Sequence, residues 1–185
     1  KHLIRSPLLG AFSIYTILCA TSVALIEGVD WETITKSLAH SKLDLRLHPI
    51  TLPDGTTILD DTYNASPTST IAALGLLKSL TGRRVAVLGD MLELGQYEKS
   101  GHQSVGLAAA NSAEILVLIG ERSKMIAEAA ISQGFSEQNI FWFADSIQAA
   151  DQLGKLINKG DLVLIKGSNS MRMDRVLQAV VGGES

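Results

Sequence analysis

Short apolar segments alternate with helix-like segments from residue 66 onward, and this alternation restricts the possible folds more than any other feature of the chain. Apolar runs typical of buried strands lie at 84–88, 115–119, 140–143 and 162–165. Helical patterns precede, separate and follow them, at 66–80, 98–112, 122–133, 146–158 and after Ser168. Such alternation predicts a parallel sheet with helices on both faces.

A β-hairpin is predicted before this alternation. Leu45–Leu52 alternates in polarity, and Pro49 marks it as an edge strand because proline cannot donate to a sheet ladder. Pro53–Thr56 is a turn signal, and Thr57–Leu59 is the returning strand. The predicted fold class from residue 45 onward is therefore α/β: a Rossmann-like, mostly parallel sheet with helices on both faces.

The first 44 residues predict helices without strands. Pro7 suits the first turn of a helix over Leu8–Ile26, and a second helix is expected over Trp31–Ala39. Ser6–Ile26 carries no charge, so its length permits a membrane helix. Its several serines and threonines favour a buried core helix, and we expect no membrane anchor.

Composition argues against several functional classes. The chain is 46% hydrophobic and 19% charged, which is ordinary for a globular protein. A net charge of -3 and scattered basic residues give no reason to expect nucleic acid. The single cysteine, Cys19, cannot form an internal disulfide, which suits a reducing cytoplasm. We expect a cytoplasmic monomer.

Polar segments follow the ends of the predicted strands, where ligands bind in open α/β sheets. They are Asp60–Ser66, Gly89–Gly95, Gly120–Ser123 and Lys166–Ser170. The paired carboxylates of the first segment suit a metal, a ribose or a basic group, or they simply cap a turn. The two carboxylates of the second suit an amine or a metal, or they are structural.

The last of these segments suits an anion. Lys166, free backbone N–H groups and a helix dipole would together hold a carboxylate or a phosphate. It is not a P-loop, because Gly-x4-Gly-Lys-Ser/Thr occurs nowhere in the chain, and neither does Gly-x-Gly-x-x-Gly, HExxH or CxxC. Autonomous nucleotide hydrolysis is therefore not expected.

These clusters, in this order, resemble the C-terminal domain of Mur ligases, specifically of the type that adds D-alanyl-D-alanine. That type carries Asp-Asp-Ser/Thr-Tyr-Asn-Ala-x-Pro, Gly-Asp-Met-x-Glu-Leu-Gly, His-x-x-Val-Gly and Lys-Gly-Ser. The corresponding segments here are 60–67, 89–95, 102–106 and 166–168. The resemblance implies that residues 1–44 are the last helices of a central ATP-binding domain and that 45–185 are the C-terminal domain.

The resemblance also implies an activity. It predicts an ATP-dependent ligase that joins D-alanyl-D-alanine to UDP-muramoyl-tripeptide, with the P-loop and most Mg²⁺ contacts in a central domain outside this chain. The fragment alone is expected to be inactive, and its partners are those small molecules and its own N-terminal and central domains. That Lys1 is not methionine agrees with a piece of a longer protein.

Residue roles follow from the matched motifs. The implied nucleotide contacts are Arg46, Asp61 and Asn64, with Arg46 also neutralising phosphate charge as the catalytic residue. The implied substrate contacts are Asp90, Glu93, His102, Lys166, Ser168 and Asn169. Within them, the turn from Lys166 would hold the dipeptide carboxylate, while Asp90 and Glu93 would orient its ammonium. No metal ligand is predicted.

Two departures from the family pattern stand out. Ser13 and Thr16 replace asparagines that contact adenine, and Asn169 replaces an arginine. A neutral amide at that position leaves Lys166 and Arg172 as the candidate carboxylate ligands. Two alternatives to this type of ligase are a non-catalytic Rossmann-like binding module and another ligase of the Mur superfamily.

Overall fold

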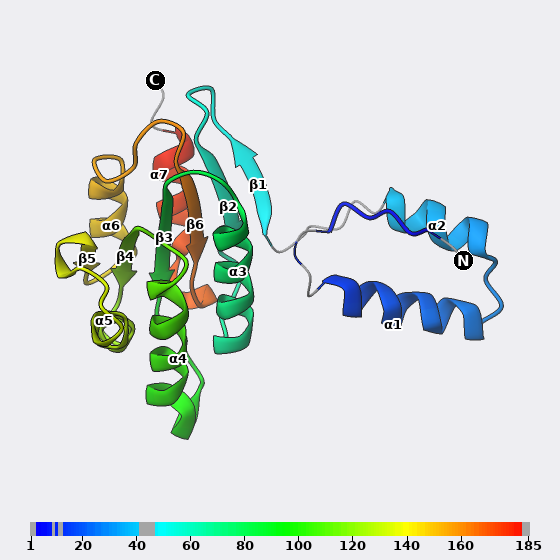
Figure 1. Ribbon diagram of the computed structural model, residues 1–185, viewed down its shortest axis with the longest axis horizontal. Helices are drawn as coiled ribbons and strands as arrows, with labels where there is room; N and C mark the ends of the chain where they lie inside the picture. Colours follow the sequence, from blue (N-terminus) through cyan, green and yellow to red (C-terminus); the bar gives the residue numbers. More distant parts are fainter. Residues whose placement is uncertain (1–2, 9, 11–12, 41–46, 183–185) are drawn as a thin grey trace. The chain divides into compact units, whose positions relative to one another are not determined.

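A computed structural model describes residues 3–8, 10, 13–40 and 47–182 of the protein. The chain divides into two compact units, residues 1–45 and 46–185. Within the described residues, the larger unit contains a six-stranded sheet and the smaller unit a pair of helices (Figure 1).

The sheet of the larger unit has the order β1-β2-β6-β3-β4-β5. Among the strands that the structure describes, only β1 runs antiparallel to its neighbour, and the four remaining pairings are parallel. The last strand of the chain, β6, therefore lies between β2 and β3 in the middle of the sheet. The strands are β1 (His48–Thr51), β2 (Thr57–Asp61), β3 (Arg84–Gly89), β4 (Ile115–Ile119), β5 (Ile140–Phe143) and β6 (Leu162–Lys166).

Helices cover both faces of this sheet because the apolar strands supply side chains to both sides. On β3, Ala86 and Leu88 join the cluster under α3, α4 and α5, while Val85 and Val87 join the cluster under α6 and α7 (Figure 1). The helices are α3 (Pro67–Ser79), α4 (Glu98–Ala110), α5 (Lys124–Ser132), α6 (Ser146–Leu153) and α7 (Met173–Gly182).

The predicted hairpin and alternation are confirmed, with shifts at the ends of some elements. The hairpin pairs His48 with Asp60 and Thr51 with Thr57. The α6 helix ends at Leu153 rather than near 158, because Gly154 follows and the chain tightens into i→i+3 turns. Of the predicted first strand, residues 45 and 46 lie outside the described part of the chain.

The smaller unit consists of α1 (Ser13–Ile26) and α2 (Trp31–Ala39). The turn between them uses Gly28 at φ +80°, and the Asp30 carboxylate caps α2 by accepting the Thr33 N–H at 2.9 Å. The first helix begins at Ser13, later than the predicted Leu8. None of the helices in the described ranges combines the length and apolar character that a membrane crossing needs.

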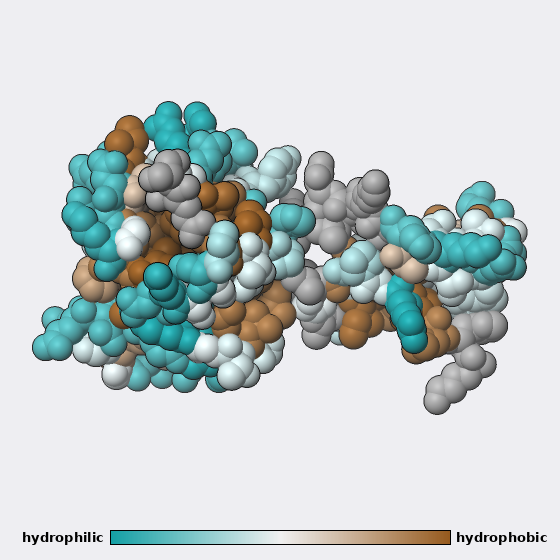
Figure 2. All heavy atoms as spheres, turned by 90° about the horizontal axis from the view of Figure 1, so that it is seen from above, coloured by the Kyte–Doolittle hydropathy of each residue, from teal (hydrophilic) through white to brown (hydrophobic). Residues whose placement is uncertain are grey.

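The α1 helix carries large apolar side chains on its surface. Ile14, Tyr15, Leu18, Val23 and Ile26 are each more than half exposed. Figure 2 shows such apolar side chains lying open on the smaller unit. A helix that is apolar on most sides is ordinarily covered by other parts of a larger core.

Candidate functional site

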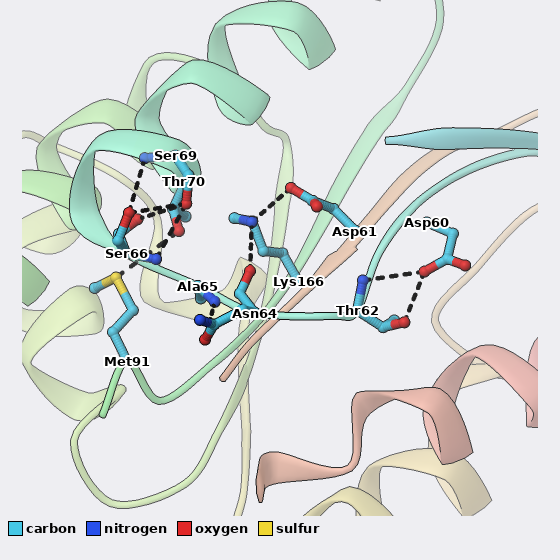
Figure 3. Close-up of polar contacts among 10 residues, drawn as sticks. All are labelled: Asp60, Asp61, Thr62, Asn64, Ala65, Ser66, Ser69, Thr70, Met91 and Lys166. Atoms are coloured by element: carbon cyan, nitrogen blue, oxygen red, sulfur yellow. Dashed lines mark hydrogen bonds and ion pairs between the residues drawn. The ribbon is translucent and has the colours of Figure 1, made fainter. Parts of the chain in front are cut away.

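The four predicted polar segments meet at the carboxyl end of the sheet. The loops after β2, β3 and β6 are neighbours there because β6 pairs with both β2 and β3. In this register Asp61 at the end of β2 lies directly opposite Lys166 at the end of β6. Figure 3 shows these two residues with Asn64 from the loop after β2.

Lys166 and Asp61 form a buried ion pair. The Lys166 Nζ donates to Asp61 Oδ2 at 2.5 Å and to the Asn64 carbonyl oxygen at 2.8 Å (Figure 3). The side chain of Lys166 is 1% exposed and that of Asp61 is 4% exposed. The ammonium therefore faces the protein interior, where it binds the loop after β2 to the central strand.

Ser168 and Asn169 connect the same three loops. The Ser168 N–H donates to the Asp90 carbonyl oxygen at 3.1 Å, and Ser168 Oγ accepts the Leu92 N–H at 2.8 Å. The exposed Asn169 donates its Nδ2 to the Tyr63 carbonyl oxygen at 3.3 Å. The segment after β6 thus holds the other two loops in place through both backbone and side chains.

His102 supports the loop after β3 from inside α4. The ring is 0% exposed. Its Nε2 accepts the Met91 N–H at 3.1 Å, so Nδ1 carries the proton and donates to the Glu98 carbonyl oxygen at 2.7 Å. Both ring nitrogens are used by the backbone, so His102 in this structure positions the loop and has no face open to a substrate.

Asp90 is a buried carboxylate at the end of β3. It is 3% exposed, and Oδ1 accepts the Ser123 N–H at 2.7 Å, while Arg122 Nη1 lies 3.7 Å from Oδ2. Burial raises the pKa of Asp90, and the hydrogen bonds from the Ser123 and Arg122 backbone oppose that rise. Gly120 leaves it room, since a Cβ there would lie 2.6 Å from the carboxylate.

Two of the remaining predicted contacts are on the surface. Asn64 and Glu93 are exposed, and so is Tyr63 beside Asn64. Glu93 has a backbone φ of +63°, a conformation that costs energy for a residue with a side chain and is frequent at functional sites. Arg46 lies outside the described residues. In the described ranges, no three metal-binding side chains come together.

A pocket of about 350 Å³ lies beyond the ends of β3, β4, β5 and β6. We call it the α7 pocket, because Arg172, just before α7, and Arg175, in the first turn of α7, form one side of it. Its other lining residues include Asp90, Glu121 and Asp145.

Sequence reasoning found some of these pocket residues and missed others. Asp90 and Arg172 were singled out, and the segment containing Glu121 was placed at the correct edge of the sheet. Asp145 was missed although it follows the predicted strand 140–143, and a polar residue after a strand was the signal that identified the other segments. Arg175 gives no local signal, because it is an ordinary helical residue until α7 docks against the sheet.

Substituting Asp90 with asparagine is expected to stabilise the fold at pH 7. The raised pKa means that Asp90 contributes stability below its unfolded-state pKa and loses that contribution as pH rises through its folded-state pKa. Asparagine keeps an acceptor for the Ser123 N–H without the buried charge. Urea unfolding of both proteins would show the gain at pH 7 and a smaller difference below about pH 4. An equal loss at both pH values would contradict it.

The fold and this site define a class of protein: an α/β domain whose polar loops gather at the carboxyl end of a mostly parallel sheet. A family model described as "Mur ligase, glutamate ligase domain" matches residues 45–169, well over half of the chain. The chain belongs to the Mur ligase family.

Two curated relatives carry the name UDP-N-acetylmuramoyl-tripeptide--D-alanyl-D-alanine ligase. The relative from Escherichia coli is 35% identical over 94% of this chain, and the relative from Bacillus subtilis is 30% identical over 95%. The matches cover 38% and 39% of the length of those relatives, respectively. The chain therefore corresponds to less than half of each.

Solved structures match this chain over a similar share of their length. A crystal structure of MurF from Acinetobacter baumannii matches 97% of this chain with a TM-score of 0.84 and 28% identity, over 39% of its own length. MurF from Thermotoga maritima in complex with ADP matches 95% of the chain with a TM-score of 0.76 and 26% identity, again over 39% of that protein. Both likenesses extend over the two units of this chain.

Proposed function

We propose that this chain is the C-terminal part of an ATP-dependent ligase that adds D-alanyl-D-alanine to UDP-N-acetylmuramoyl-tripeptide in peptidoglycan precursor synthesis. The observation that carries the proposal is that the matched motifs after β2, β3 and β6 come together at one edge of the sheet. Curated relatives that match nearly the whole of this chain are named for that reaction.

We assign residues 1–44 to the end of a central ATP-binding domain and residues 45–185 to the C-terminal domain. The exposed apolar side chains of α1 support this assignment, because a helix of that composition needs a core around it. A neighbouring domain of the same protein would supply that core. We place the whole enzyme in the cytoplasm, as a monomer.

The nucleotide contacts of this part are proposed at the loop after β2 and at Arg46. Asn64 and its neighbour Tyr63 are exposed and can reach a ligand. Asp61 is buried against Lys166, so its contact with the nucleotide would require that pair to open. Mg²⁺ does not fit the described residues, which bring no three metal-binding side chains together, and we assign it to the central domain.

The reaction implied by the resemblance has two steps. The γ-phosphoryl group of ATP passes to the terminal carboxylate of the tripeptide, which gives an acyl phosphate and ADP. The dipeptide amine then attacks that carbonyl carbon, phosphate leaves, and the new amide nitrogen loses a proton. The part of the enzyme described here contributes positioning and charge complementarity to this chemistry.

Phosphate release by the full-length protein tests the proposal. With ATP, Mg²⁺ and UDP-muramoyl-tripeptide, release should require D-alanyl-D-alanine, while the 185-residue chain alone should give none. Single D-amino acids and L-dipeptides serve as control amines. Release that needs a different amine would assign the chain to another ligase of the superfamily, and no release with any amine would leave only a binding role.

A further inference from the structure

The family resemblance assigned the carboxylate of the incoming dipeptide to the turn that begins at Lys166, but the structure gives that turn other partners. Lys166 is 1% exposed and binds Asp61 and the Asn64 carbonyl oxygen. Ser168 binds the loop after β3, and Asn169 carries no charge. A ligand carboxylate at this turn would have to compete with contacts that hold three loops together.

The α7 pocket offers a different cation. Arg172 is already neutralised, since its Nε and Nη2 donate to the two oxygens of Asp174 at 3.0 and 2.8 Å. Arg175 lines the same pocket and is exposed. Among the residues that the structure describes, the Arg175 guanidinium has no ion-pair partner. Arginine binds carboxylates through paired N–H donors, which favours it over lysine for this task.

Negative charge lies across the same pocket. Glu121 is paired with Lys124, and Asp145 caps α6 by accepting the Ile147 and Gln148 N–H groups at 2.9 Å. Asp90 has one oxygen bonded to Ser123 N–H and a second oxygen whose nearest cation is 3.7 Å away. The Asp145 cap uses Oδ1 alone, so Asp90 and Asp145 each keep one oxygen that can accept from a ligand ammonium. Of the two, Asp90 is the one buried at the end of β3.

We propose that the α7 pocket holds the incoming dipeptide, with Arg175 binding its carboxylate and Asp90 its ammonium group. This inference rests on the proposed function. The pocket volume of about 350 Å³ suits a small ligand, being near the lower end of the ~300–1,000 Å³ typical of ligand pockets. A zwitterion with one charge at each end matches a pocket with a cation on one side and a carboxylate on the other.

A substrate-variant cycle in the full-length enzyme tests this assignment. Arg175→Gln should raise KM for D-alanyl-D-alanine by about tenfold to a hundredfold, the size expected for a lost charge-assisted hydrogen bond, with little change in kcat. D-alanyl-D-alaninamide has no carboxylate, so wild type and Arg175→Gln should use it equally poorly. Arg175→Lys keeps the positive charge, so its KM for D-alanyl-D-alanine should lie between those of wild type and Arg175→Gln, with no change for the amide.

Lys155→Gln is the matched control, because it removes an exposed positive charge outside the pocket and should leave both KM values unchanged. Equal losses with acid and amide in Arg175→Gln, or no loss with either, would overturn the assignment of Arg175. A wild-type enzyme that does not use the dipeptide at all would overturn the proposed function, and this assignment with it. If the wild-type enzyme uses the dipeptide but Arg175→Gln shows no loss specific to the acid, only the pocket assignment is overturned.

Discussion

Replacing Lys166 with methionine is expected to lower the free energy of unfolding by roughly 3–5 kcal/mol at pH 7, the usual effect of breaking a buried ion pair on one side. The substitution leaves the Asp61 carboxylate buried without its ammonium partner and frees the Asn64 carbonyl oxygen. Urea unfolding of the 185-residue chain, followed by circular dichroism, measures the change.

The double variant Asp61→Asn, Lys166→Met is the control that separates charge from packing. It removes both charges, so most of the lost stability should return. Acid provides a second check: the deficit of the single variant should shrink as pH falls, because the stranded carboxylate then becomes protonated. A single variant as stable as wild type would mean that the pair is open to solvent, and Lys166 would again be available to a ligand.

The hairpin and the alternation of strands and helices could be predicted because their signals are local. Strand 84–88 and helix 98–112 each carry their periodicity within a dozen residues, and the structure has β3 and α4 there. The place of β6 between β2 and β3 could not be predicted this way. That position depends on pairing between strands that are far apart in the sequence, and no local sequence pattern records such pairing.

That non-local pairing also explains why the predicted site was only partly informative. The motifs identified the loops after β2, β3 and β6, and those loops do meet. Motif wording could not separate residues that face a ligand from residues that hold the loops together. Lys166 and His102 look like ligand residues in sequence, yet burial and two hydrogen bonds each give them structural partners. Arg175 is the reverse case: it shows no signal in the sequence, yet it lines the pocket once α7 packs against the sheet.

Substituting Gly106 with alanine is expected to destabilise the protein by roughly 2 kcal/mol, within the ~1–3 kcal/mol typical of overpacking. A Cβ at this position in α4 would lie 2.4 Å from the Ile126 carbonyl oxygen and 2.7 Å from the Ala129 Cβ of α5. Neither atom belongs to a flexible side chain, so the two helices must separate. Gly75→Ala is the control: its Cβ has no atom within 4 Å, and it should stabilise α3 by about 0.5–1 kcal/mol.

Separation of α4 from α5 should also reach the candidate site. His102, one turn before Gly106, binds the Met91 N–H, and Ser123 just before α5 binds Asp90. Amide hydrogen exchange at Met91 and Ser123 should therefore accelerate in Gly106→Ala and stay unchanged in Gly75→Ala. Unchanged exchange in a destabilised Gly106→Ala would mean that the loop after β3 does not depend on His102, and the positioning role given to that residue would be wrong.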